Sequence, residues 1–235
     1  MLGLGVGFYK LAGDSFLGGF STPKDLPGIA HWYQHNTGLE ESDESFPEDG
    51  EQITKWTDQV GTEHFIGESN LPTYTEATGT LNFGGSSKIL TIASGTGSDI
   101  TFDGDFAIYV RVKFASTPNS SDIFLKDTDT TNEFFRAQSA TVIRAKLSST
   151  SNNWTVGTMG TSAFHNIGIE RTGDDVRVYL DGTESSTGAI TAGNTWSIDT
   201  LKGGQADEFS TLIIVKGQAL STGNRAELQT YLAAL

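Results

Sequence analysis

Apolar and polar residues alternate in short runs along most of the chain after residue 28. The clearest run spans residues 105–114, and one of its faces is apolar: Phe106, Ile108, Val110, Val112 and Phe114. Strict alternation is typical of a β-strand with one buried face. Similar runs lie at residues 29–40, 51–59, 79–84, 87–94, 121–127, 132–138, 141–148, 153–158, 164–172, 175–182 and 209–217. Many short strands separated by turn residues predict a sandwich or a closed barrel.

Two of these runs also predict hairpins. Residues 175–182 end in Asp181-Gly182, and a polar segment follows. A type I′ turn needs a positive φ at both central residues, and Asp-Gly supplies them readily. The preceding run, residues 164–172, reaches residue 175 through Gly173 and Asp174, so a second tight hairpin is expected there.

The end of the chain changes from strand to helix spacing. Four apolar residues follow the i, i+3, i+4, i+7 pattern of an amphipathic helix: Leu228, Tyr231, Leu232 and Leu235. Asn224 and Glu227 have the spacing of a capping box, which predicts that the helix begins at Asn224. The helix is expected to pack against the sandwich.

The composition agrees with a turn-rich β protein. The chain has 235 residues, of which 28 are glycine and 19% are charged. This length fits one all-β domain, which we place at residues 29–235. The net charge of −14 repels a phosphate backbone, so no nucleic-acid partner is expected. There is no cysteine, which excludes thiol catalysis and disulfides.

The N-terminal segment, residues 1–28, is apolar and rich in glycine. It lacks the basic start and cleavage site of a signal peptide, and it is too short and interrupted to span a membrane, so we expect neither targeting nor a membrane partner. A segment of this kind cannot form its own core. It is expected to dock through four aromatic residues, Phe8, Tyr9, Phe16 and Phe20, either on its own domain or on another protein.

Several motifs resemble a known family. FHNIGIERTGDDVRVYLDG, FSTLIIVKGQALSTG and ITKWTDQVGTEHF are similar to segments of concanavalin A-like, laminin-G-like jelly-roll domains of the kind found in bacteriophage virion structural proteins. The W-x-D-x-x-G element of the third motif is part of this resemblance. It implies an all-β jelly-roll sandwich with a short C-terminal helix and an extended N-terminal segment. It implies little about function, because this fold carries lectins, glycosidases and capsid accessory proteins alike.

No catalytic residues are predicted. Glycosidases of this fold place an E-x-D-x-E set on one strand, so that two carboxylates flank the bond to be cleaved. Glu41-Ser42-Asp43 begins such a set, but Ser45 and Phe46 stand where its second glutamate belongs. His31 and His35 are four residues apart, yet they lie in an expected strand and are interpreted as structural. The chain is therefore expected not to be an enzyme.

Two binding sites remain as alternatives to ordinary structural roles. Asp99, Asp103 and Asp105 lie in one glycine-containing loop and could bind calcium, although turn chemistry explains them equally well. No other cofactor is predicted. A sugar could stack on tryptophan beside amide groups, and the candidates are Asn152, Asn153, Trp154, Asn194 and Trp196. The favoured alternative is that both tryptophans belong to the core.

The resemblance leads to two functional hypotheses. The first is a virion structural protein, a capsid decoration or a tail or fibre accessory, displayed on the virion surface. It would bind a major capsid or tail protein through residues 1–28 and stabilise the particle or touch a host glycan. A homo-oligomer would suit that setting. The second is a secreted or surface lectin module that binds carbohydrate, with calcium as a candidate ion.

Overall fold

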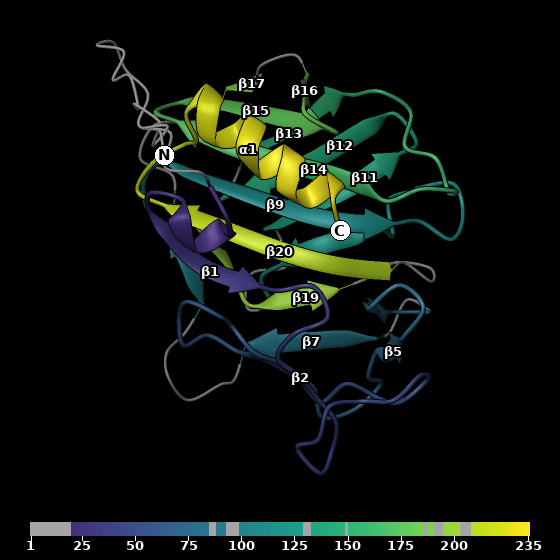
Figure 1. The fold of residues 1–235 in the computed structure, drawn as a ribbon. Coiled ribbons are helices and arrows are strands. Elements are labelled where there is room, and N and C mark those ends of the chain that lie inside the picture. Colours follow the sequence, from purple (N-terminus) through teal and green to yellow (C-terminus); the bar gives the residue numbers. More distant parts are fainter. Residues whose placement is uncertain are drawn as a thin grey trace, which may run out of the picture.

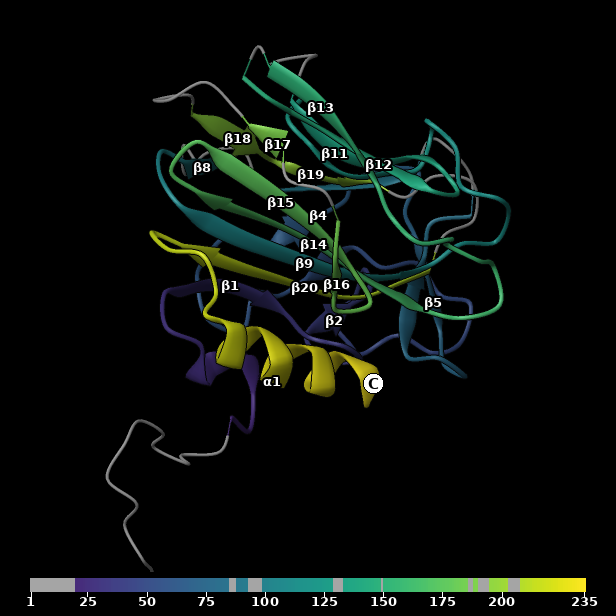
Figure 2. The ribbon, with the colours of Figure 1, turned by 90° about the horizontal axis from the view of Figure 1, so that it is seen from above.

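The computed structural model describes residues 20–84, 88–92, 99–128, 133–148, 150–185, 188–189, 195–202 and 208–235. Two antiparallel sheets of nine described strands each make up the fold. One carries the C-terminal helix and is called the helix-side sheet; the other is called the open sheet. In Figure 2, α1 lies on one side of the helix-side sheet and the open sheet on the other, so the molecule has three layers.

The helix-side sheet runs in the order β16-β15-β14-β9-β20-β6-β5, with β1 paired to β20 and β17 paired to β15. Its strands are β16 (Thr183–Glu184), β15 (Asp175–Leu180), β14 (His165–Thr172), β9 (Phe106–Lys113), β20 (Glu208–Lys216), β6 (Thr80–Asn82), β5 (Thr73–Thr75), β1 (Ile29–Tyr33) and β17 (Gly188–Ala189).

The open sheet runs in the order β13-β12-β11-β10-β19-β7-β4-β3-β2. Its strands are β13 (Thr150–Thr155), β12 (Val142–Leu147), β11 (Phe134–Ser139), β10 (Ile123–Lys126), β19 (Thr200–Lys202), β7 (Ile89–Ile92), β4 (Phe65–Ile66), β3 (Lys55–Trp56) and β2 (Leu39–Glu40). A third, two-stranded sheet pairs β18 (Trp196–Ile198) with β8 (Ile100–Phe102).

The core lies between the two large sheets, and a second apolar cluster lies between the helix-side sheet and α1 (Thr222–Ala233). The central strands β9, β14 and β20 are therefore covered on both faces and are buried almost throughout. Figure 1 shows α1 crossing these strands, with the short 3-10 helix η1 (Pro23–Asp25) beside β1. This agrees with the predicted all-β jelly-roll sandwich and its C-terminal helix.

The helix packs as its spacing predicts, but it begins earlier. Leu228 and Leu232 are fully buried, and Tyr231 packs at the edge of the same cluster. The cap is Ser221, whose hydroxyl accepts a hydrogen bond from the backbone N–H of Asn224. The predicted start at Asn224 is therefore wrong by one turn, because serine in extended backbone caps as well as asparagine does.

A buried ion pair anchors the helix to β14. Arg225 donates from Nε and an η nitrogen to the two carboxylate oxygens of Glu170, at 2.9 and 2.7 Å. The hydroxyl of Tyr109 donates to the same carboxylate at 2.6 Å. The Arg225 guanidinium also lies 4.4 Å from the ring centre of Tyr179. Burial raises the pKa of Tyr179 to about 12, and the neighbouring charge of Glu170 acts in the same direction.

The predicted hairpin at Asp181-Gly182 is confirmed. Asp181 and Gly182 have φ angles of 50° and 81°, both positive as a type I′ turn requires. The chain then returns as β16, whose two residues are exposed at the edge of the sheet. An edge strand with no buried face needs no apolar residues, which explains the polar segment after this turn. No helix among the described residues is long and apolar enough to cross a membrane.

Candidate functional site

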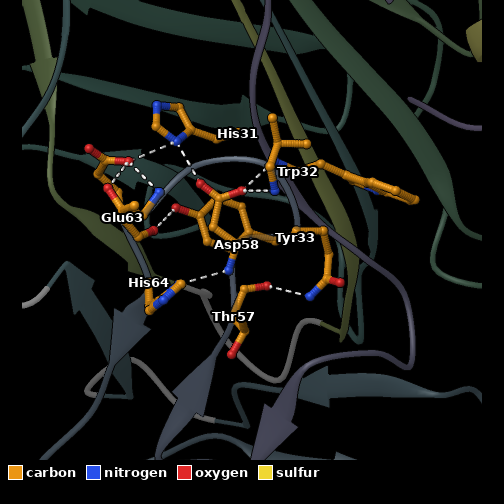
Figure 3. A network of polar contacts seen from close by, with 10 residues as sticks. His31, Trp32, Tyr33, Thr57, Asp58, Glu63 and His64 are labelled. Carbon is orange, nitrogen blue, oxygen red and sulfur yellow. Dashed lines mark hydrogen bonds and ion pairs between the residues drawn. The ribbon is translucent and has the colours of Figure 1, made fainter. Parts of the chain in front are cut away.

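The W-x-D-x-x-G element forms a buried polar network between β1 and the loop at residues 58–64 (Figure 3). His31 Nδ1 donates to Asp58 Oδ2 at 2.7 Å. The other oxygen, Oδ1, accepts from the backbone N–H of Trp32 and of Val60, each at 3.0 Å. A Cβ at Gly61 would lie 2.5 Å from Asp58 Oδ2, so only glycine fits there. The network thus explains why the element contains both the aspartate and the glycine.

This network also contains a possible set of metal ligands. Among the described residues, His31, Asp58 and Glu63 are the one group of at least three whose ligand atoms lie within 4.8 Å of one another. Burial by itself raises the pKa of Asp58, but the hydrogen bonds from His31 and from backbone N–H groups lower it below its usual value. The carboxylate is therefore already satisfied by protein donors. We interpret the network as a structural link, as the sequence analysis did for His31.

A second polar cluster lines a hollow of about 560 Å³ beside α1. Arg111 lies 4.9 Å from the ring centre of Phe164 and donates to the side chain of Asn166 at 3.0 Å. Next to it, His165 Nδ1 donates to Asp181 Oδ2 at 2.8 Å. Arg111, Asn166 and Asp181 are thus hydrogen-bonded to one another or to His165. Gln229 of α1 also lines the hollow, and its Nε2 is buried with no hydrogen-bond partner among the described residues.

The His165–Asp181 pair makes stability depend on pH. The hydrogen bond with Asp181 raises the pKa of His165, so its contribution is complete below about pH 6.5 and is lost as pH rises through the folded-state pKa. Burial by itself raises the pKa of Asp181, but the hydrogen bond from His165 lowers it, so that contribution is lost as pH falls through its folded-state pKa. Stability from this pair should therefore peak between about pH 4 and 6.5.

An Asp181→Asn variant tests this prediction, because asparagine tolerates the positive φ of the turn but carries no charge. Urea unfolding of the variant and of the unchanged protein should be followed from pH 4 to pH 8. The variant is expected to lose less stability than the unchanged protein between about pH 6 and 8. Equal losses in both proteins would show that the pair does not contribute.

The outer face of the open sheet is different, because none of the described helices covers it. Phe134 on β11 points outward and is half-buried, while the neighbouring Phe135 is in the core. Phe134 lies directly opposite Lys126 on β10 and Lys146 on β12. A groove of about 280 Å³ runs along Phe134 and Lys126, with Glu133 on its wall.

The next row of the same face carries two arginines. Arg136 lies opposite Arg144 on β12, and Arg144 lies opposite Asn153 on β13. The guanidinium carbons of Arg136 and Arg144 lie 4.5 and 5.8 Å from the ring centre of Phe134. Burial and the charge of Arg144 lower the pKa of Arg136. We call the outward side chains of these two rows the Phe134 face: Phe134, Lys126, Lys146, Arg136, Arg144 and Asn153.

The predicted sugar-binding residues are only partly placed where a sugar could reach them. Trp154 and Trp196 are 1% and 0% exposed, so their rings pack in the core and stacking on them is excluded. This corrects the sugar-stacking hypothesis and agrees with the alternative that both are core residues. Asn152 donates to the carbonyl of Ala189 at 2.6 Å. Asn153 is exposed on the Phe134 face. Asn194 lies outside the described residues.

The three aspartates proposed for calcium do not come together. Asp105 accepts a hydrogen bond at 2.7 Å from the backbone N–H of Gly173, which lies in the turn between β14 and β15. Asp99 and Asp103 are exposed, and the three carboxylates do not meet the 4.8 Å spacing found at His31. The described structure therefore does not bring the three carboxylates together as one calcium site.

The predicted docking residues fall mostly outside the described part of the chain. Phe8, Tyr9 and Phe16 lie in residues 1–19, which the structure does not describe. Phe20 packs edge-to-face against Tyr231 of α1, with ring centres 6.0 Å apart. Leu26 is buried beneath the same helix. The described end of the segment therefore rests on its own domain.

The Phe134 face was not predicted from the sequence, although a signal for it is present. The runs at residues 132–138 and 141–148 both alternate, and their polar positions carry Phe134, Arg136 and Arg144. An aromatic residue on the polar side of a strand, next to two arginines, is the pattern that would have revealed it.

Comparison with known proteins shows the fold and not the family. No protein-family model matches the chain, and no curated protein sequence matches it. Trypanosoma rangeli sialidase matches with a TM-score of 0.56 and 11% identity over 86% of this chain and 32% of its own. The binding domain of Paraclostridial Mosquitocidal Protein 1 has a TM-score of 0.57 and 13% identity, over 84% of this chain and 53% of its own.

The binding domain of Botulinum Neurotoxin DC, in complex with SialylT, has a TM-score of 0.57 and 11% identity over 91% of this chain and 52% of its own. This chain thus spans about a third of the sialidase and about half of the two binding domains. At these identities the likeness shows the fold alone, an antiparallel β-sandwich.

Proposed function

We propose that this chain is a non-catalytic carbohydrate-binding module and that the Phe134 face holds the sugar. The observation that carries the proposal is the half-buried ring of Phe134, which lies on the outer face of the open sheet amid polar side chains from three strands. An aromatic ring can cover the apolar face of a sugar, while amide and guanidinium groups bind its hydroxyls. Asn153 supplies the amide and Arg136 and Arg144 the guanidinium groups.

The structural neighbours support a binding role without assigning it. Two of them are binding domains, and one of these is in complex with SialylT. The sialidase has also been solved in complex with sialic acid, with a TM-score of 0.54. The chain we describe lacks the E-x-D-x-E set at its one candidate position, which favours binding over hydrolysis.

The wider setting of this module is proposed from the sequence resemblance alone. In that setting the chain is displayed on a virion, held by its N-terminal segment, and presents the Phe134 face to a host glycan. Mass spectrometry of purified particles would have to find the chain there. Its absence would leave a secreted or surface lectin module.

A Phe134→Ser variant tests the binding site directly. On a glycan array, the unchanged protein is expected to bind, and the variant should lose about tenfold or more in affinity because stacking on the ring is removed. The matched control is Phe46→Ser, since Phe46 is 49% exposed in a different hollow beside Tyr74. Loss of binding in the Phe46 variant, with binding retained in the Phe134 variant, would refute the assignment of the site.

A further inference from the structure

The two arginines of the Phe134 face break a general rule of sheet pairing. Arg136 and Arg144 are directly opposite each other on neighbouring antiparallel strands. Like charges in that position are destabilising. None of the ion pairs found among the described residues involves either arginine. Within the described part of the chain, this repulsive pair thus forms no ion pair with a carboxylate.

The charge of the whole chain makes this pair more unusual. Lysine and arginine together number 15, against 29 aspartates and glutamates. Four of those cations nevertheless lie on the Phe134 face, because Lys126 and Lys146 stand on either side of Phe134. A local conflict with folding is expected mainly at functional sites, where a ligand supplies the missing partner.

The hydrogen bonds of the arginines leave specific donors unused. Arg136 donates from its η nitrogens to the carbonyl of Ser120 and to the side chain of Gln138, at 3.1 and 2.8 Å. Arg144 donates to the hydroxyl of Ser151 at 3.2 Å. All three acceptors are neutral. The Nε atoms of both arginines are buried and have no hydrogen-bond partner among the described residues.

The ring of Phe134 also holds the guanidinium groups in place. Both groups lie within 6 Å of its centre, at 4.5 and 5.8 Å, where cation–π attraction acts. Asp127 and Glu133 line the groove at the Lys126 end of the face. Their charges repel an anion from that end, so the arginine pair is the more attractive position for it.

We propose that the Arg136–Arg144 pair binds an anionic group, a carboxylate or a sulfate, on the sugar held by the Phe134 face. This rests on the proposed carbohydrate-binding function and names its ligand class. A carboxylate or sulfate oxygen accepts well from guanidinium N–H groups, and two arginines can hold two oxygens of one anion. Binding would also relieve the repulsion between the two side chains.

The test compares matched neutral and anionic glycans on an array, followed by titration with lactose, 3′-sialyllactose and 3′-sulfolactose. At least one anionic member of a pair is expected to bind about tenfold tighter than its neutral parent, and this preference should weaken as salt rises from about 0.05 to 0.5 M. The sialyl and sulfo probes separate a carboxylate from a sulfate ligand.

An Arg144→Gln variant should lose the preference for the anionic glycan. Its affinity for the neutral glycan should fall by less than its affinity for the anionic one, because glutamine can still bind a hydroxyl but carries no charge. Its melting temperature should rise, because the repulsion is removed, and this separates lost recognition from misfolding. The matched control is Arg177→Gln, an exposed arginine on β15 that should leave the preference unchanged.

Three results would overturn the proposal. Equal affinity for neutral and anionic glycans would refute the anion site and leave carbohydrate binding intact. Binding to no glycan would refute both. Tighter binding to a short single-stranded oligonucleotide than to any anionic glycan would show that the arginine pair recognises the phosphates of a nucleic acid and not an anionic sugar.

Discussion

An Asp58→Ala variant is expected to have a free energy of unfolding about 3–5 kcal/mol below that of the unchanged protein, because several buried N–H groups lose their acceptor at once. Asp58 Oδ1 accepts from the backbone of Trp32 and Val60, and Oδ2 accepts from His31. The side chain of Asp58 is fully buried, so water cannot replace it without local opening. Urea unfolding at pH 7, with the midpoint and slope both measured, gives the difference.

The control for this prediction is Asp58→Asn, which keeps the oxygen that faces the two backbone N–H groups. It should cost about 1–2 kcal/mol, because one hydrogen bond is altered and the others remain. Equal losses in the two variants would mean that the charge, and not the acceptor geometry, holds the loop. Added Zn²⁺ should leave the melting temperature unchanged, and a rise that disappears in Asp58→Ala would instead identify His31, Asp58 and Glu63 as an ion site.

The elements with strong periodicity could be predicted from the sequence. The alternation at residues 105–114 predicted the long strand β9, because a buried face restricts the sequence of a strand. The Asp181-Gly182 pair predicted the hairpin between β15 and β16, because a left-handed turn restricts the sequence of the turn. The short strands could not be located in this way. Residues 51–59 were expected to form a strand, but only Lys55–Trp56 does, because the rest of that segment is fixed by side-chain contacts such as that of Asp58 with Trp32.

The candidate site was harder to predict than the fold. A tryptophan beside asparagines resembles a sugar platform in sequence, yet Trp154 occupies an inward position of β13 and is covered by the opposite sheet. The neighbouring Asn153 points outward to Arg144, which lies on another strand. Which residues share a face depends on pairing register across strands, and a single sequence contains no direct record of it.

The second large effect is expected at the helix anchor. An Arg225→Met variant should lose about 3–5 kcal/mol, because the Glu170 carboxylate stays buried without its cation. Glu170 is 3% exposed, and its carboxylate accepts hydrogen bonds from Arg225 and from the hydroxyl of Tyr109. In the variant only the hydrogen bond from Tyr109 would remain. Methionine keeps much of the arginine stem, so packing on Tyr179 is largely preserved and the loss reports the charge. Chemical denaturation followed by tryptophan fluorescence measures it.

The double variant Arg225→Met/Glu170→Gln decides how this anchor works. Removing both charges takes away the uncompensated carboxylate. The free energy of unfolding of the double variant should therefore exceed that of Arg225→Met by at least about 2 kcal/mol. That coupling would mean that the ion pair mainly fixes the position of the helix on the sheet. The burial of Leu228 and Leu232 would then supply most of the free energy that holds the helix there. Strictly additive losses would contradict this, since they would show that each side chain contributes through contacts of its own. In either case the glycan binding proposed for Phe134, on the opposite face of the sandwich, should be unchanged, because the two sites share no side chain.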